Sequence, residues 1–72
     1  MYKEIFHTRL KGAREEAEFT QREIAEITGL TQDKISKYEH GKLEPDIENL
    51  GKLADALNVT TDWLIGRGKK QQ

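Results

Sequence analysis

The chain has 72 residues, no cysteine, and 12 lysines and arginines against 13 aspartates and glutamates, for a formal net charge of −1. A domain of this size lies near the lower limit at which one apolar core holds a fold, and without cysteine neither a disulfide framework nor a thiolate metal site is available. No apolar run approaches the ~18 residues of a membrane span, and the N-terminus lacks the hydrophobic stretch of a signal peptide. We therefore expect a soluble protein located in the cytoplasm.

The balance of charge bears directly on any nucleic-acid function. DNA-binding domains often carry a basic excess, because neutralising phosphates supplies most of the sequence-independent affinity for DNA. That excess is absent from this chain. A DNA-binding face would therefore have to come from an uneven distribution of its charges.

The first two predicted helices follow from apolar spacing and from a capping signal. Residues that step by four, three and four positions, as on one buried helix face, are Phe6, Leu10, Ala13 and Ala17. The segment Thr20-Gln-Arg-Glu23 has the pattern of a capping box, in which the hydroxyl and the carboxylate each satisfy a free backbone N–H. It predicts a second helix that ends at Gly29. The apolar residues of this helix are Ile24, Ala25 and Ile27.

Two further helices are predicted downstream. Thr31 can cap a third helix that runs through about Glu39 and ends before Gly41. Asp46 or Glu44 begins a fourth helix, with a proline near its first turn. Its apolar stripe is the most regular in the chain and consists of Ile47, Leu50, Leu53, Ala54 and Leu57.

The chain closes with a short helical turn and a polar tail. Thr60 or Thr61 begins the turn, whose apolar residues are Trp63, Leu64 and Ile65. We expect a single domain over residues 1–66, and over residues 67–72 a short basic tail that is disordered. Nothing in the sequence is typical of a strand, so the pattern predicts an all-α protein with five short helices around one core.

The connection between the second and third predicted helices is the most informative feature. The segment Ile27-Thr-Gly-Leu30 places glycine where the backbone must reverse, and so short a turn holds two helices at a steep angle. Ala25 lets the two helices approach closely. An ordinary helical hairpin shares part of this pattern, but the combined spacing favours a helix-turn-helix between about Thr20 and His40.

Four stretches carry a resemblance to a known family. They are Phe19-Thr-Gln-Arg-Glu-Ile-Ala, then Gly-Leu-Thr-Gln, then Ile-Ser-Lys-Tyr-Glu-His-Gly-Lys-Leu-Glu-Pro45, and finally Leu-Asn-Val-Thr-Thr-Asp-Trp-Leu-Ile-Gly66. In this order and spacing the chain resembles the phage repressor/Cro-like (Xre-type) helix-turn-helix family. The resemblance covers roughly residues 6 to 66. It implies a compact, lambda-repressor-like five-helix bundle whose second motif helix enters the DNA major groove.

The resemblance also implies a role for each matching position. The residues that would face base edges are Gln32, Asp33, Lys34 and Lys37. The residues that would hold backbone phosphates are Gln21, Ser36, His40 and Lys42. Arg14 and Glu39 match an ion pair that braces the recognition helix against the first helix.

Side-chain chemistry supports these roles unevenly. Gln32 suits adenine, because an amide can accept from its N6 and donate to its N7, and the two lysines can reach guanine or phosphate unless they belong to a solvated face. Asp33 can accept a hydrogen bond from cytosine N4. Alternatively, because it lies two residues after Thr31, its negative charge can interact favourably with the positive end of the helix dipole. His40 can touch phosphate or act as a C-terminal cation, and the Ser36 hydroxyl can instead bond a neighbouring turn.

These features predict a sequence-specific, DNA-binding transcriptional regulator that acts as a repressor and binds a palindromic operator as a homodimer. One recognition helix reads only a few base pairs of double-stranded DNA, and two copies would read half-sites about 34 Å apart. The candidate residues of a two-fold interface are Leu57, Leu64 and Ile65. The alternative is an antitoxin or protein-interaction adaptor that uses the same fold.

An enzymatic function is not expected. The chain has no nucleophile–base pair, no metal-binding set and no phosphate-cradling glycine loop, and so compact a bundle offers little pocket. His7 and His40 are far apart in sequence, so a metal site is not expected. We also expect no cofactor and no small-molecule ligand.

Overall fold

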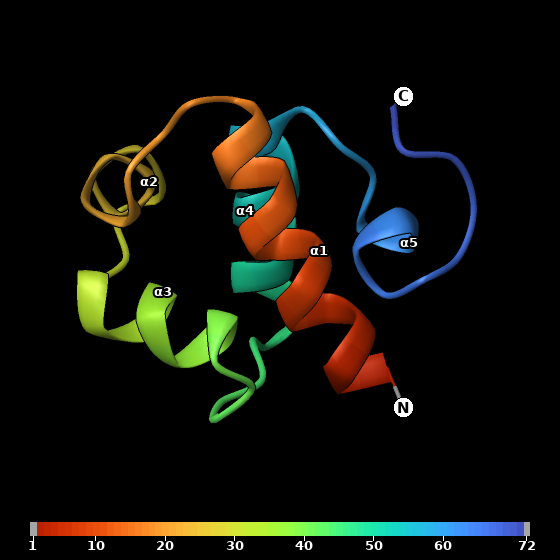
Figure 1. Cartoon of the computed structure of the whole chain (residues 1–72), viewed down its shortest axis with the longest axis horizontal. Helices are drawn as coiled ribbons and strands as arrows, with labels where there is room; N and C mark the ends of the chain where they lie inside the picture. Colours follow the sequence, from red (N-terminus) through yellow and green to blue (C-terminus); the bar gives the residue numbers. More distant parts are fainter. Residues whose placement is uncertain (1, 72) are drawn as a thin grey trace.

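The computed structural model describes residues 2–71, which form five helices and no strand (Figure 1). The helices are α1 (Tyr2–Glu16), α2 (Gln21–Thr28), α3 (Gln32–Glu39), α4 (Ile47–Leu57) and α5 (Thr61–Leu64). This arrangement confirms the predicted all-α, five-helix fold. No helix among these residues is long and apolar enough to cross a membrane.

The starts of the two central helices are fixed by side chains that satisfy backbone N–H groups. The Thr20 hydroxyl accepts from the Glu23 backbone at 3.0 Å, while the Glu23 carboxylate accepts from the Thr20 backbone at 2.8 Å. This reciprocal pair is the predicted capping box of α2. At the start of α3, the Thr31 hydroxyl accepts from the Lys34 backbone at 3.1 Å. Both caps form where the sequence predicts them.

The two later helices begin at one of the alternatives that the sequence left open. The Asp46 side chain accepts from the Asn49 backbone at 2.8 Å, so Asp46 and not Glu44 caps α4. Thr60 caps α5, because its hydroxyl accepts from the Trp63 backbone at 3.0 Å.

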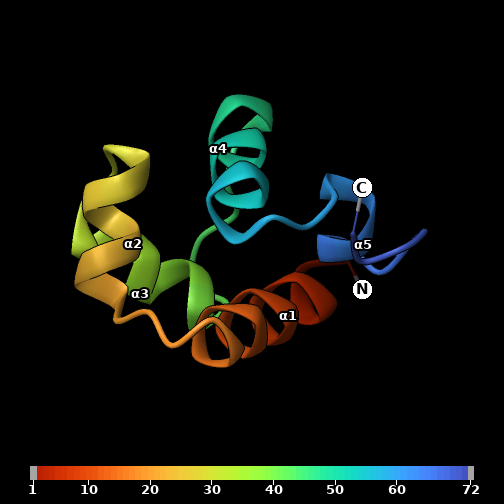
Figure 2. The ribbon, with the colours of Figure 1, turned by 90° about the horizontal axis from the view of Figure 1, so that it is seen from above.

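The core lies where the five helices face one another. Figure 2 shows α2 and α3 together at one end of α1, with α5 near the other end. The ring of Phe6 meets that of Tyr38 edge-on, with centroids 6.1 Å apart, and this contact joins α1 to α3. The buried apolar residues are Phe6, Leu10, Ala13, Ile24, Ala25, Ile35, Tyr38, Leu53, Ala54, Leu57, Val59 and Leu64.

Three apolar residues of the predicted helices are exposed. Ala17 lies beyond the end of α1, because the chain turns away at Glu18, which has a left-handed φ of 62°. Ile27 is 54% exposed on α2, and Ile47 is 90% exposed at the first position of α4. Helical periodicity places these residues on the apolar face of a helix. They are exposed because no neighbouring element packs over their positions.

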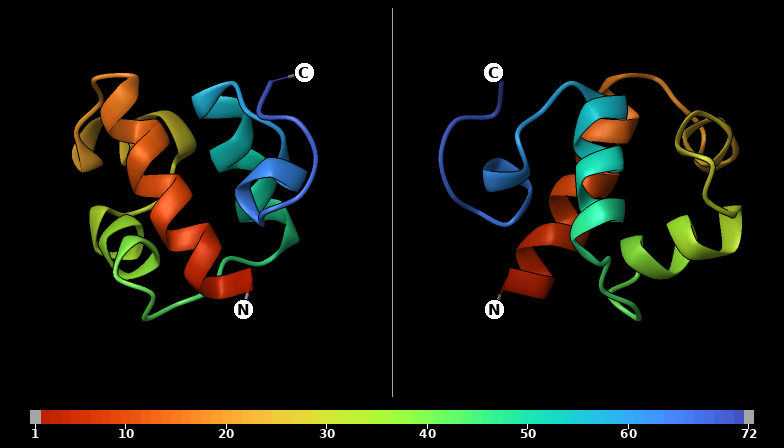
Figure 3. Two further views of the ribbon diagram at one scale, coloured as in Figure 1. Left: turned by 45° about the vertical axis from the view of Figure 1, so that its right-hand side comes forward. Right: turned by 180° about the vertical axis from the view of Figure 1, so that it is seen from behind.

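The tail differs from the expected disordered segment. The backbone N–H of Thr60 donates to the Lys70 carbonyl at 2.9 Å, and the Thr60 hydroxyl donates to the Lys69 carbonyl at 2.6 Å. The Lys70 ammonium also lies 2.7 Å from Glu16 of α1 and 5.1 Å from the centre of the Trp63 ring. Figure 3 shows the tail passing around α5. Residues 67–71 of the tail therefore lie against the start of α5, and residue 72 is outside the described residues.

Candidate nucleic-acid interface

The turn between α2 and α3 sets the angle at which α3 is presented. Gly29 has a φ of +76°, a left-handed backbone conformation. Glycine adopts it without steric strain, whereas residues with a Cβ atom rarely do. Thr28 also stabilises the turn. Its buried hydroxyl donates to the Ile24 carbonyl at 2.7 Å and accepts from the Leu30 backbone N–H at 3.3 Å. Beneath the turn, Ile35 is fully buried on the inner side of α3. The outer side of α3 therefore projects from a fixed base.

Glu39, at the end of α3, is the centre of a buried polar network. Its carboxylate receives the Arg14 guanidinium in a two-point contact of 2.6 and 2.9 Å, so the predicted ion pair between α1 and α3 is present. The side chain of Glu39 is 1% exposed and that of Arg14 is 12% exposed. Arg14 also donates to the Phe19 carbonyl at 2.8 Å, which ties in the connection between α1 and α2.

Hydrogen bonding to Glu39 stabilises the charged form of Arg14. The bond to Glu39 raises the pKa of Arg14 above its usual value, while burial opposes that rise. Because the arginine guanidinium is already charged at all ordinary pH values, the shift leaves its charge unchanged. The two-point contact with Glu39 therefore braces α1 against α3.

The four residues predicted to read bases lie together on the exposed side of α3. Gln32, Asp33, Lys34 and Lys37 are all exposed. Asp33 and Lys37 form an ion pair one turn apart, with Oδ2 and Nζ separated by 3.1 Å. An exposed pair of this kind contributes only about 0–1 kcal/mol, so Lys37 can exchange Asp33 for another anion at little cost.

The four residues predicted to contact phosphates differ in their exposure and in the hydrogen bonds that their side chains already make. Gln21 is half-buried, and its amide donates to the Glu39 carboxylate at 3.1 Å, so it belongs to the buried network as well. His40 directs Nδ1 to the Ser36 carbonyl at 2.7 Å, with the Ser36 hydroxyl 3.4 Å away. Lys42 is exposed.

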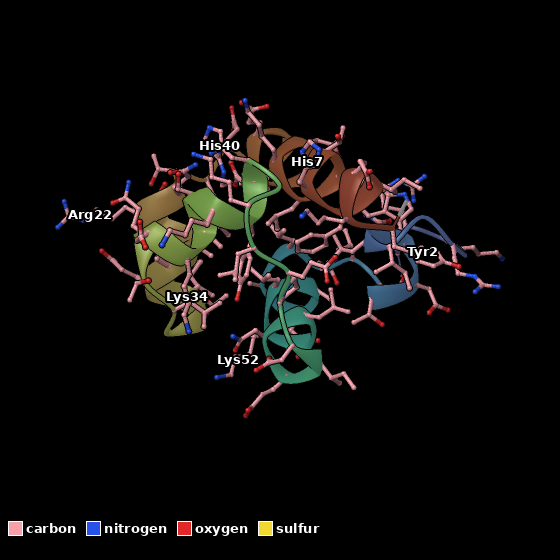
Figure 4. The ribbon with its side chains drawn as sticks, turned by 90° about the horizontal axis from the view of Figure 1, so that it is seen from below. Tyr2, His7, Arg22, Lys34, His40 and Lys52 are labelled. Atoms are coloured by element: carbon pink, nitrogen blue, oxygen red, sulfur yellow. The ribbon has the colours of Figure 1, made fainter. Side chains whose placement is uncertain are left out.

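Two further residues at this surface were not singled out from the sequence. Arg22 follows Gln21 in the first turn of α2, and its side chain is 80% exposed beside Glu26. Figure 4 shows Arg22, Lys34 and His40 around the same end of the molecule, on α2, on α3 and at the end of α3. Figure 4 also shows His7 of α1 beside the loop that leaves α3. The adjacency of Arg22 to Gln21 was a usable sequence signal, whereas the place of His7 depends on how α1 packs.

The predicted two-fold interface is wrong in two of its three residues. Leu57 is 8% exposed and Leu64 is 0% exposed, so both belong to the core of one chain and neither can cover a second. They are buried because α5 packs against both α4 and α1, while α4 also packs against α2. Ile65 is half-buried and lines a groove of about 240 Å³ between the start of α1 and the loop before α4.

Comparison with known proteins supplies relatives of this arrangement. The chain is 41% identical over 61 residues to the SPbeta prophage-derived uncharacterized HTH-type transcriptional regulator YonR of Bacillus subtilis, covering 85% of this chain and 56% of that protein. It is also 41% identical over 59 residues to the cryptic phage CTXphi transcriptional repressor RstR of Vibrio cholerae, covering 82% of this chain and 53% of that protein. The chain thus spans about half the length of these relatives. Neither is named as an enzyme.

Solved structures agree with the fold and with the family. The P22 c2 repressor, crystallised with a synthetic operator, superposes with a TM-score of 0.83 at 27% identity, covering 88% of this chain and 96% of that one. The restriction-modification controller protein C.AhdI of Aeromonas hydrophila superposes with a TM-score of 0.80 at 28% identity, covering 83% of this chain and 91% of that one. The helix-turn-helix family model matches residues 10–64. The chain therefore belongs to the helix-turn-helix family of Xre/Cro/C1-type proteins.

Proposed function

We propose that this protein is a sequence-specific, DNA-binding transcriptional regulator in which α3 enters the major groove. The observation that carries the proposal is the contrast between the two sides of α3. One side is buried and held through Glu39, and the other exposes an amide, a carboxylate and two ammonium groups. A rigid helix with such an outer face suits the reading of base edges.

Each exposed side chain of α3 has a role in this proposal. Gln32 pairs with adenine, since its amide both accepts and donates. Lys34 and Lys37 reach guanine or a nearby phosphate. Asp33 accepts from cytosine N4 and repels α3 from sites that lack this donor, which favours the correct sequence.

Phosphate contacts surround this face. The start of α2 presents free backbone N–H groups beside Gln21, a natural site for a phosphate, and Arg22 adds a charge there. Ser36, His40 and Lys42 lie at the end of α3 and in the loop that follows. These contacts give a chain with a net charge of −1 a local positive face for DNA.

We further propose that the regulator is a repressor and works in the cytoplasm, where its DNA target would be. The names of two similar proteins, the CTXphi transcriptional repressor and the P22 c2 repressor, support repression. The lack of cysteine fits a reducing compartment. Residues 1–66 form the DNA-binding domain in this proposal.

We propose that two copies bind a palindromic operator and meet through the groove beside Ile65. The residues that line the groove are Tyr2, Lys3, Phe6, Glu44, Pro45, Leu50 and Ile65. Charges of both signs make the surface self-complementary, as an interface between identical subunits requires. Tyr2 is 53% exposed, so apolar surface is available for a second copy to cover.

The test is selection of bound sequences from a random DNA library. We expect one short motif repeated in two-fold symmetry, with half-sites about one helical turn apart. Replacing Ile65→Gln should leave binding to one half-site intact and weaken the cooperative binding of two. A single motif without symmetry would contradict the homodimer, and the absence of any enriched motif would favour the protein-interaction alternative.

A substitution on α3 tests the reading face itself. Gln32→Ala should weaken binding to the selected site about tenfold, because a bidentate base contact contributes about 1–3 kcal/mol. The matched control is Lys69→Ala, an exposed residue of the tail, which Figure 1 places across α1 from α3. Equal losses from both variants would contradict readout by α3.

A further inference from the structure

The last turn of α3 is held by a histidine from α1. The Nδ1 atom of His7 lies 3.2 Å from the Glu39 carbonyl oxygen. A carbonyl oxygen only accepts, so Nδ1 must carry the proton of this bond. His7 is half-buried, and 32 residues separate it from Glu39 in the sequence. The bond therefore joins two helices and is not a feature of one helix.

The Glu39 carbonyl depends on His7 because the backbone that follows bonds elsewhere. The backbone N–H of His40 donates to Ser36, that of Gly41 to Tyr38 and that of Lys42 to Lys37, at 3.0, 3.2 and 2.9 Å. The chain turns back on itself through these bonds. None of them reaches Glu39, and its carbonyl is instead satisfied by the His7 ring.

The His7 ring also packs against the first residues of the loop. Gly41 has a φ of +72°, and a Cβ atom at this position would lie 3.3 Å from Cδ2 of His7. Glycine thus allows the backbone to turn and leaves space for the ring at the same point. The ring consequently fixes where the loop departs from α3.

This contact matters because of the residues that the loop carries. His40 and Lys42 flank Gly41, and both have proposed contacts with phosphate. Figure 4 shows His7 and His40 beside the start of this loop. Arg14 holds the carboxylate of Glu39 while His7 holds its carbonyl, so α1 grips the residue at two separate points.

We propose that His7 is a positioning residue that holds the loop from His40 to Lys42 in the geometry that binds phosphate. The inference rests on the proposed DNA-binding function. Arg14 sets the position of α3, and His7 sets the direction in which the loop leaves it. Loss of the His7 bond therefore weakens phosphate contacts and leaves base preference unchanged.

The first test needs no DNA. Backbone amide hydrogen exchange is followed by NMR for Gly41 and Lys42 in the full chain, with His7→Phe and His7→Asn as variants. Phe keeps the ring and loses the donor, whereas Asn keeps a donor near the position of Nδ1. We expect exchange about five- to tenfold faster in His7→Phe, in line with the loss of one net hydrogen bond, and near-normal exchange in His7→Asn. Unchanged exchange in His7→Phe would overturn the proposal.

The second test measures affinity for the selected DNA across a salt series. His7→Phe should weaken binding about five- to tenfold and reduce the salt slope by about one, as the loss of one phosphate contact does. His7→Asn should stay within about twofold of the parent protein. Thr8→Ala is the control, because Thr8 is exposed on the same helix and bonds only Glu4 within α1. His7→Ala provides a second variant without the donor if Phe prevents folding.

The outcomes separate the two levels of inference. A normal affinity and salt slope in His7→Phe would overturn the positioning role while leaving the DNA-binding function intact. A parent protein that binds no selected DNA would overturn the proposed function, and the exchange experiment would still decide whether His7 holds the loop. A weakened affinity with a changed base preference would contradict a role confined to phosphate contacts.

Discussion

Among single residues, Asp33 controls how much positive charge the exposed side of α3 presents. Its carboxylate pairs with Lys37 at 3.1 Å, and both side chains are well exposed. The sequence left open whether Asp33 faces bases or interacts with the positive end of the helix dipole. Its position in the first turn of α3 is compatible with both roles. Its partner adds a third effect, because the ion pair keeps Lys37 engaged, and in the proposed complex a phosphate would have to displace Asp33.

Replacing Asp33→Asn should therefore loosen specificity. We expect affinity for scrambled DNA to rise about three- to tenfold at low salt, with a salt slope steeper by about one, because one more cation becomes available to phosphate. Fluorescence anisotropy with operator and scrambled DNA over a potassium chloride series measures both quantities. Asp55→Asn removes the same charge from an exposed position on α4. An identical rise in that control would assign the effect to net charge alone.

The residues of the candidate site were predictable to different degrees for a physical reason. Exposure of Gln32 and Lys34 follows from the period of one helix, which the sequence contains. The bond from Gln21 to Glu39 depends on the crossing of α2 and α3, which no local pattern specifies. The buried positions of Leu57 and Leu64 depend in the same way on how α4 and α5 pack.

Between elements, the pair of Arg14 and Glu39 joins α1 to α3 at a buried position. Arg14→Ala should lower the free energy of unfolding by about 3–5 kcal/mol, because it leaves a buried carboxylate without its charged partner. The double replacement Arg14→Met with Glu39→Leu should recover most of that loss, since apolar groups of similar size often replace a buried pair without cost. Urea unfolding of the single and double variants measures the coupling. Additive losses in the double variant would contradict this account.

The end of α1 contains a local strain that can be removed. Glu18 adopts a φ of 62°, a left-handed conformation that costs a side-chain-bearing residue about 1 kcal/mol relative to glycine. Glu18→Gly should therefore stabilise the protein by about 1 kcal/mol, even though glycine usually destabilises. Thermal unfolding provides the measurement. Glu18→Gln, which removes the charge but keeps the strain, should gain less, and an equal gain would show that charge was responsible.

Helix ends were easier to predict than helix faces. The caps at Thr20 and Thr31 and the reversal at Gly29 depend on residues within one turn, so sequence alone specifies them. The exposure of Ile27 and Ile47 depends on how far neighbouring helices extend over each side. Periodicity identifies the residues that share a helix face. It does not indicate how much of that face a neighbouring helix covers.

In the whole molecule, the tail completes the packing around α5. Removing residues 67–72 eliminates the two hydrogen bonds to Thr60 and the contacts of Lys70 with Glu16 and Trp63. We expect a loss of about 1–2 kcal/mol, which corresponds to a fall in Tm of roughly 5–10 °C for a domain of this size. Trp63 is the single tryptophan in the chain, so its fluorescence reports the change directly.

A point variant provides the control for this truncation. Lys69→Ala removes a charge from the tail but keeps the carbonyl that accepts from the Thr60 hydroxyl. It should unfold at nearly the parent temperature. A truncated chain with the parent Tm and an unchanged Trp63 spectrum would mean that the tail adds nothing to the fold.

The long-range contacts of α1 have a consequence for how the domain folds. Arg14 and His7 bind a residue 25 and 32 positions later, and Arg9 donates to the Trp63 carbonyl 54 positions later. Closing such distant pairs costs entropy before the contacts add stability. Folding should consequently be all-or-none. The brace of α3 then forms in the same cooperative step as the core, so a fragment that ends before Glu39 should not hold α3 in place.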